Sequence, residues 1–208
     1  MSSIEISGLC IQPIALRLEE WVAEGKLGDE ELERRLDSDA RALLEHGLAV
    51  TNRVPLALAE SLVGLVAEQL GGETGIVDCA HAIAADWMEL EAMAPLVEGA
   101  RTLVDGAGFL VAQASERLLC GTTWRYEGGR SRFVVRLEGL ESAGPELKCL
   151  LGASLARLVE LALAPEVDVR FAGVDESELS IFGDRSEGAL RDPARESHLY
   201  RAALVPPR

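Results

Sequence analysis

The stretch TTWRYEGGRSRFVVRLEG, residues 122–139, decides the fold, because apolar and polar side chains alternate on both sides of a Gly-Gly pair. A period of two is typical of a strand with one buried face, and adjacent glycines are typical of a tight turn. Cys120, Trp124 and Tyr126 are expected on one face of the first strand, and Phe133 begins the buried face of the returning strand. The stretch therefore predicts a β-hairpin.

A second hairpin is predicted nearer the C-terminal end. It follows a strongly apolar helix, ELKCLLGASLARLVELAL at residues 146–163, whose small residues indicate close packing. The segment EVDVRFAGVDESELSIF, residues 166–182, then alternates, turns and alternates again. Two hairpins around one helix, after a helical N-terminal half, predict an α+β fold with a four-stranded antiparallel sheet packed on helices.

Five helices are predicted before the first hairpin, because apolar residues recur there every three or four positions. Their expected positions are residues 13–25, 29–46, 55–71, 76–87 and 95–119. The first is expected to begin at Pro13, a residue typical of a first helical turn, and residues 37–39 are an expected break in the second. The fifth is expected to be the central buried helix, with Gly106 and Gly108 either kinking it or letting another element approach closely.

Three segments follow from this pattern. Residues 1–53 are expected to form an N-terminal helical segment and residues 54–182 an α+β domain of ligand-binding type. Residues 183–208 turn polar and arginine-rich, which predicts a C-terminal tail or a strip that docks a partner.

The charge and composition exclude several function classes. The chain has 208 residues with 35 acidic and 20 basic side chains, so its net charge of −15 repels phosphate and disfavours direct nucleic-acid binding. No apolar run approaches the roughly 20 residues of a membrane span, and the N-terminal residues do not resemble a signal peptide. Four cysteines without a CxxC pair predict reduced thiols in the core. We therefore expect a cytoplasmic protein that does not bind a membrane.

Catalytic and metal-binding patterns are weak. Asp78 and His81 lie three positions apart on a predicted helix and could offer two metal ligands or an acid–base pair, but a surface hydrogen bond is the preferred interpretation. No GxSxG motif positions a nucleophilic serine, and residues 106–108 are too short for a dinucleotide loop. We expect no enzyme activity, no catalytic residue, no metal and no cofactor.

Aromatic and sulfur side chains around the first hairpin are the candidate ligand-binding residues, because a pocket is usually apolar with few polar anchors. These candidates are Trp124, Tyr126, Cys120, Cys149, Phe109 and Phe133. The alternative, which we prefer, is that they form an ordinary core between sheet and helices. The arginines of the hairpin are expected on an exposed sheet face that is either solvated or receives an acidic partner, and these are Arg125, Arg130, Arg132 and Arg136.

The order of buried helix, hairpin, helix and hairpin over residues 55–182 resembles the superfamily of vinyl-reductase-type and haem-NO-binding-type small-molecule-binding domains. Several bacterial signalling proteins of unassigned function resemble it too. The resemblance implies a cavity between helices and sheet that takes a small molecule for regulation. The haem-binding branch implies an iron-ligating histidine before the first hairpin and a Tyr-x-Ser-x-Arg motif. No histidine occurs between His81 and His198 and the motif is missing, so a haem sensor is not expected. The cysteines of metal-binding vinyl-reductase members are also missing around the second hairpin, with Cys149 the only remnant.

A weaker resemblance is to the N-terminal effector-binding domain of AraC-type regulators. It rests on the spacing from residues 53–71 through 100–113 to 129–139 and 167–171, and the residues after Phe182 are not expected to leave room for the DNA-binding domain of those regulators. The main hypothesis is a non-enzymatic regulatory module that binds a small apolar molecule and signals through protein partners. The alternative is an acidic adaptor or homodimer without a small ligand, in which residues 29–46 and the polar tail dock a regulator.

Overall fold

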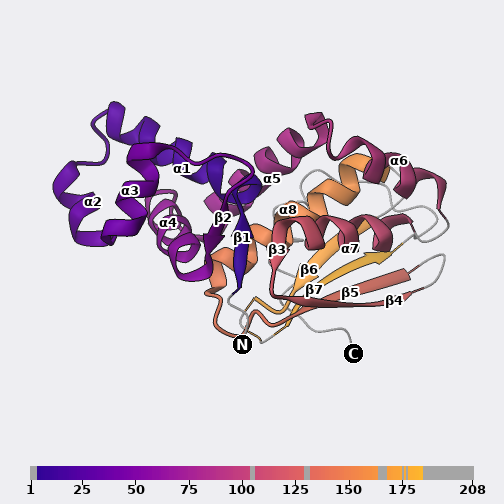
Figure 1. Cartoon of the computed structure of the whole chain (residues 1–208). Coiled ribbons are helices and arrows are strands. Elements are labelled where there is room, and N and C mark those ends of the chain that lie inside the picture. The colour runs from indigo at the N-terminus through magenta and orange to yellow at the C-terminus, as the bar shows by residue number, and fades with distance from the viewer. Residues whose placement is uncertain are drawn as a thin grey trace.

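The four-stranded antiparallel sheet predicted from the two hairpins is present in a computed structural model of the chain (Figure 1). The model describes residues 4–103, 106–128, 132–163, 168–174, 176 and 178–184. The strands are β4 (Thr123–Gly128), β5 (Arg132–Glu138), β6 (Asp168–Ala172) and β7 (Leu179–Asp184), in the order β4-β5-β7-β6. The pairing Trp124↔Leu137 and Val135↔Ile181 puts alternate side chains on one face, as predicted, and the α+β class is confirmed. Gly128 pairs with Phe133, so the first strand extends into the predicted Gly-Gly turn.

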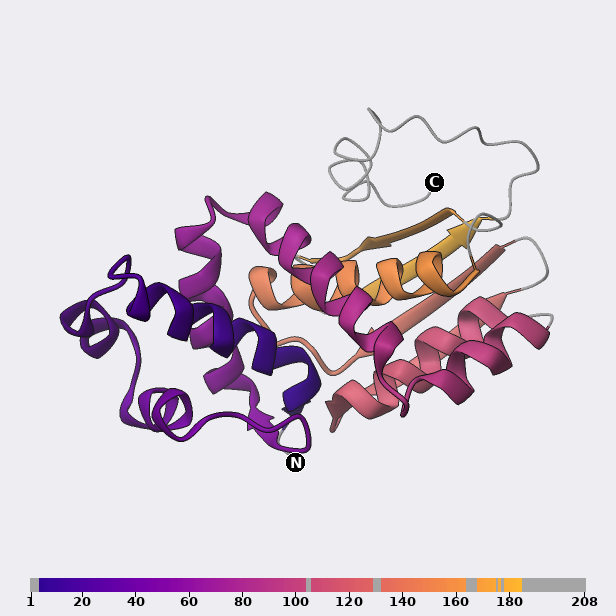
Figure 2. The ribbon, with the colours of Figure 1, turned by 90° about the horizontal axis from the view of Figure 1, so that it is seen from above.

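Two helices cover the buried face of this sheet. Helix α7 (Gly106–Leu118) contacts β4 and β5, and helix α8 (Pro145–Leu163) contacts β6 and β7. Figure 2 shows α8 in orange running along the sheet in the middle of the molecule, with the indigo and purple N-terminal helices gathered at one end. Helices α7 and α8 therefore lie between the sheet and further helices, because α4 and α5 also pack on α8.

The central buried helix is α8, and the prediction of one central helix over residues 95–119 was wrong. That segment forms α6 (Ala94–Thr102) and α7, which pack against each other, and Leu103 between them is 50% exposed. The turn requires glycine at position 106, because any side chain there would overlap the carbonyl oxygen of Ala100. Helix α6 ends at Thr102, and α7 begins at Gly106.

Small residues let α8 occupy the centre, as the sequence indicated. A β-carbon on Gly152 would lie 2.6 Å from Cδ2 of Phe171 on β6, so only glycine allows this approach. Ser154 is buried and its hydroxyl donates to the carbonyl of Ala80 at 3.3 Å, across the contact with α5 (Glu73–Glu89). Close packing on both sides explains why α8 is buried almost all round.

A second, three-stranded sheet was missed by the sequence reasoning. Its strands are β1 (Glu5–Ser7), β2 (Arg53–Pro55) and β3 (Leu119–Cys120), in the order β2-β1-β3. Cys120 pairs with Glu5 there and does not continue the strand of Trp124, so its expected place on the hairpin was wrong. The reason is Gly121, whose φ of 82° turns the chain between β3 and β4.

Helix α1 (Gly8–Ala23) begins five residues earlier than expected. The hydroxyl of Ser7 caps it by accepting from the amide of Leu9 at 3.3 Å, and Pro13 lies inside the helix. Proline has no N–H, so the carbonyl of Leu9 loses its helical donor. The indole of the buried Trp87 replaces that donor, because its Nε1 donates to the Leu9 carbonyl at 3.1 Å.

The predicted break at residues 37–39 is confirmed. Helix α2 (Asp29–Arg35) ends before Leu36, and the carboxylate of Asp37 caps α3 (Ser38–His46) by accepting from the amide of Ala40 at 2.8 Å. Helix α4 (Leu56–Gln69) then follows Pro55 as expected.

The division into three segments stays a prediction, but two observations bear on its boundaries. Strand β1 pairs with strands at residues 53–55 and 119–120, and β7 extends to Asp184. Gly129, Arg130 and the tail from residue 185 lie outside the described residues, as do residues 164–167. Within the described part of the chain, no helix is long and apolar enough to cross a lipid bilayer.

Candidate functional site

The structure brings together only part of the predicted ligand-binding set. Trp124 and Tyr126 are half-buried on the helix-facing side of β4, and Phe133 is buried on β5. Phe109 is half-buried on α7, whereas Cys149 is buried on α8. Cys120 belongs to the three-stranded sheet.

Aromatic rings in this region pack onto glycines. A side chain on Gly108 of α7 would overlap the ring of Tyr126, and one on Gly183 would overlap the ring of Phe133. The ring of Phe109 lies against Gly99 of α6, 3.1 Å from the position of an added β-carbon. These contacts fill space between helices and sheet with aromatic carbon, as in an ordinary core. A ligand role for these residues stays a prediction.

The remaining hairpin side chains have local partners. Trp124 donates from Nε1 to Oε1 of Glu116 at 3.2 Å, at the surface. Arg125 and Arg136 are neighbours on β4 and β5, and each pairs with a carboxylate across the two strands. The ion pairs are Arg125–Glu138 at 2.6 Å and Arg136–Glu127 at 2.5 Å. The outer face of β4 and β5 thus carries two ion pairs between the strands, although the side chain of Arg132 is not described.

The described residues offer little for thiol or metal chemistry. Burial raises the pKa of the Cys10 thiol far above its ordinary value, and burial also raises the pKa of Cys79. Both thiols are therefore protonated and weakly nucleophilic at neutral pH. No group of three or more His, Cys, Asp or Glu side chains within the described ranges could hold a metal ion.

A cleft of about 450 Å³ lies at the other end of the molecule, between α1, α2 and α3. Each helix contributes residues from one turn of its face. The lining consists of Glu19, Val22, Ala23, Leu32, Glu33, Arg41, Leu44 and Glu45. The cleft thus has apolar walls and a charged rim.

Short helices create this cleft. Helix α1 ends at Ala23, and Gly25, with a φ of 70°, turns the chain towards α2. Helix α2 has only seven residues before Leu36, so α3 must start in a new direction. Leu36 and Ala40 are buried and hold α2 and α3 against the core, while the faces towards α1 stay apart.

The cleft has unusual electrostatics. Nε of Arg41 is buried and has no hydrogen-bond partner among the described residues, and its Nη1 lies 3.6 Å from Oε1 of Glu33. Glu19 is half-buried and Glu45 exposed, and neither forms an ion pair with another described residue. The Arg41 side chain as a whole is 38% exposed, so Nε is an unpartnered donor on a partly exposed guanidinium that a bound acceptor oxygen would satisfy.

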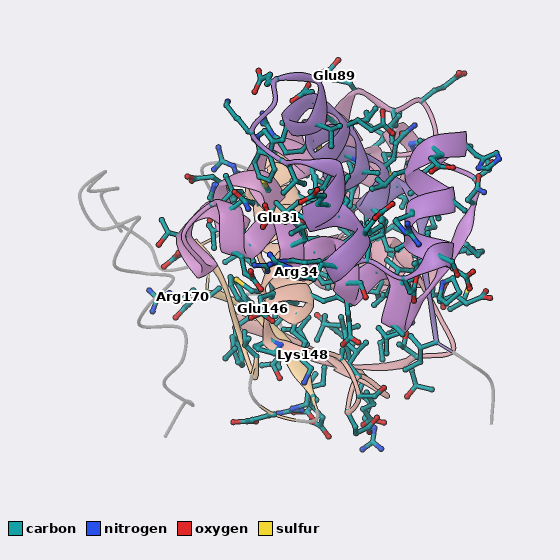
Figure 3. All side chains as sticks on the ribbon, turned by 90° about the vertical axis from the view of Figure 1, so that its left-hand side faces the viewer. Glu31, Arg34, Glu89, Glu146, Lys148 and Arg170 are labelled. Carbon is teal, nitrogen blue, oxygen red and sulfur yellow. The ribbon has the colours of Figure 1, made fainter. Side chains whose placement is uncertain are left out.

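Figure 3 faces this end of the molecule and shows how densely charged it is. The labelled Glu31 and Arg34 of α2 form one of its ion pairs, with 3.9 Å between Nη2 of Arg34 and Oε1 of Glu31. Many charges there are paired within or between neighbouring helices, whereas Glu19, Glu30 and Glu45 form no ion pair with another described residue.

Sequence reasoning missed the cleft. It predicted a helix over residues 29–46 with a break at residues 37–39, and the cleft lies beside that break. The one feature in the sequence that could have indicated the cleft is Arg41, which lies on the helix after that break. Periodicity alone does not show which charge will lack a partner.

Comparisons with solved structures show what fold the chain has. It superimposes on the Fe(II) unliganded H-NOX protein from K. algicida with a TM-score of 0.55 and 9% sequence identity, over 90% of this chain and 100% of the other. An alanine-to-glycine variant of the same protein superimposes with a TM-score of 0.56 and 8% sequence identity, over 88% of this chain and 98% of the variant. No protein-family model and no curated protein matches the chain in sequence. The haem-NO-binding-like fold is therefore confirmed, whereas the vinyl-reductase-type and AraC-type resemblances stay predictions.

The residues present do not fit a haem. Haem iron takes an axial His, Cys, Met or Tyr, and none of these lines the cleft. Between helices and sheet, Tyr126 packs against glycines, and α6 and α7 carry no histidine. His46 is exposed, and its Nδ1 hydrogen-bonds the carbonyl of Ala42 at 2.7 Å. Within the described part of the chain, neither the cleft nor α6 and α7 therefore supplies a histidine for haem iron.

Proposed function

We propose that the chain is a non-enzymatic, cytoplasmic regulatory module that binds a small, largely apolar molecule and signals through a protein partner. The cleft between α1, α2 and α3 carries this proposal. Its volume of about 450 Å³ falls within the range of small-molecule pockets, roughly 300–1,000 Å³. Its apolar walls and the buried, unpartnered Nε of Arg41 match the usual chemistry of such a pocket.

Each part of the cleft has a role in this proposal. Val22, Leu32 and Leu44 exclude water from the apolar part of the ligand, and Arg41 Nε donates to one acceptor oxygen. A ligand that contacts α1 and α3 together would hold α3 against α1. Helix α2 is linked to α4 by the Arg35–Glu68 ion pair, and α4 packs on the central α8. A ligand bound in the cleft would therefore affect the packing of α8 in the core.

The test is a compound screen by thermal shift and native mass spectrometry on the full chain. A ligand that binds only the folded state stabilises it by about 2.7 kcal/mol at a hundred times its Kd. Ala23→Trp fills the cleft from the exposed end of α1, and we expect it to abolish the shift. Ala42→Trp is the control, because Ala42 is exposed on α3 outside the lining.

Two outcomes would contradict the proposal. A shift that persists in the Ala23→Trp variant would place the ligand elsewhere. If no compound raised the melting temperature and native mass spectrometry gave only the mass of the protein without a ligand, the binding function itself would be overturned.

A second candidate is an interaction protein without a small ligand. Val134 of β5 and Phe182 of β7 pair on the outer sheet face, opposite α7 and α8, and are only half-buried. An apolar pair on a sheet face that no described helix covers suits a homodimer contact. Light scattering decides: a dimer mass that Phe182→Asp returns to the monomer mass would favour this candidate, and a monomer at all concentrations would exclude it.

A further inference from the structure

We infer that the cleft selects a small amphiphilic amine, with its ammonium group between Glu19 and Glu45, its alkyl body on Val22, Leu32 and Leu44, and an acceptor oxygen, where it has one, on Arg41. This inference rests on the proposed function and names the chemical class of its ligand.

The charge balance of the lining is the first argument. Three carboxylates and one guanidinium line the cleft, so two negative charges remain uncompensated. Arg41 and Glu33 are 3.6 Å apart and largely neutralise each other. The excess therefore resides on Glu19 and Glu45, which make no ion pair with the described residues.

The positions of these two carboxylates are the second argument. Glu19 lies on α1 one turn before Val22 and Ala23, and Glu45 lies on α3 one turn after Arg41. They therefore approach the cleft from two different helices, beside its apolar walls. An ammonium group whose apolar chain fills the cleft can pair with both, whereas a carboxylate ligand would be repelled by both.

Arg41 favours a ligand with a hydrogen-bond acceptor, and that acceptor need not be negatively charged. Its Nε is one buried donor, and the guanidinium charge is already offset by Glu33. A carbonyl, hydroxyl or ether oxygen satisfies such a donor without adding negative charge. The net charge of −15 on the chain also concentrates cations near its surface.

Three probes with the same octyl chain test the inference: octylamine, octanol and octanoate. Isothermal titration on the full chain at neutral pH and low salt should give the tightest binding for octylamine, about five- to tenfold tighter than octanoate. Salt should reduce that preference, because the paired charges are partly exposed.

Charge-neutral variants locate the preference. Glu19→Gln and Glu45→Gln should each lower octylamine affinity about fivefold and leave octanol affinity unchanged. Neither carboxylate has a described partner, so both variants should keep the melting temperature. Glu30→Gln is the matched control, because Glu30 is exposed on α2, outside the lining, and its loss changes the net charge equally.

The outcomes separate this inference from the proposed function. Equal affinity for octylamine and octanoate, or an equal loss in the Glu30→Gln control, would overturn the amine assignment and leave the cleft as a ligand site. Failure of all three probes to bind would overturn both.

Discussion

Replacing Gly108 by alanine is expected to destabilise the protein, although alanine is the better helix former. The added methyl group would overlap the ring of Tyr126, and neither element can retreat freely, because α7 also packs on α6 and α8. Overpacking of this kind costs about 1–3 kcal/mol, and the change from glycine to alanine in a helix returns about 1 kcal/mol. The free energy of unfolding should therefore fall by up to about 2 kcal/mol.

Gly64 of α4 provides the control for this experiment. It also lies inside a helix, but no atom lies within 4 Å of where its β-carbon would stand. Gly64→Ala should therefore stabilise by about 0.5–1 kcal/mol. Urea denaturation followed by circular dichroism measures both variants, and in a Tyr126→Ala background Gly108→Ala should lose its cost.

A stabilising Gly108→Ala would refute the reasoning. If it matched Gly64→Ala, free space would exist between α7 and β4, and the ring of Tyr126 would not fill it. The ligand cavity that the family resemblance implies between helices and sheet would then regain support.

Two further results are expected from buried polar groups. Trp87→Phe should cost about 2–4 kcal/mol, because it removes the donor to the Leu9 carbonyl and leaves a small cavity. In a Pro13→Ala background a backbone N–H can reach that carbonyl, so Trp87→Phe should cost at least about 1 kcal/mol less; equal costs in both backgrounds would show that the indole does not replace the missing donor. Burial keeps Cys10 protonated in the folded state, so its contribution to stability is complete below its ordinary pKa of 9.0 and is lost as pH rises further. Unfolding free energy should then fall by up to about 1.4 kcal/mol per pH unit, and Cys10→Ala should fall less steeply; parallel curves would contradict this account.

The elements that sequence predicts best are those with a long, regular pattern. Both hairpins carry an uninterrupted period of two, and α8 is a long, strongly apolar run that is buried almost all round. Strands β1, β2 and β3 have three residues or fewer, which is too short for any period to appear. The helix expected over residues 95–119 failed for a different reason. Its apolar pattern continues across the turn before Gly106. That turn brings the carbonyl oxygen of Ala100 so close to Gly106 that no side chain fits there, and the apolar pattern does not record this contact.

The candidate site is harder to predict, because it depends on contacts between residues that are far apart in the sequence. That Tyr126 packs on Gly108 and Phe133 on Gly183 follows from which glycine faces which ring, and no local pattern records this. The charge on Arg41 is visible in the sequence, but the buried, unpartnered state of its Nε depends on how α3 leaves α2. Sequence thus supplied the apolar positions of the cleft, and tertiary packing supplied its chemistry.

The location of the cleft fits a regulatory role better than the filled interface between helices and sheet does. Among the described side chains, α2 has no fully buried residue and α3 has only Ala40, while Leu32, Leu43 and Leu44 pack half-buried against the core, so these two helices are held less firmly than α8. Elements that move on ligand binding come from such weakly held parts of a protein. A ligand that contacts α1 and α3 would therefore change the order of α2 and α3 most, while the ring-on-glycine contacts keep the sheet end rigid. The Arg35–Glu68 pair and α4 then provide the connection through which a change at the cleft can reach α8.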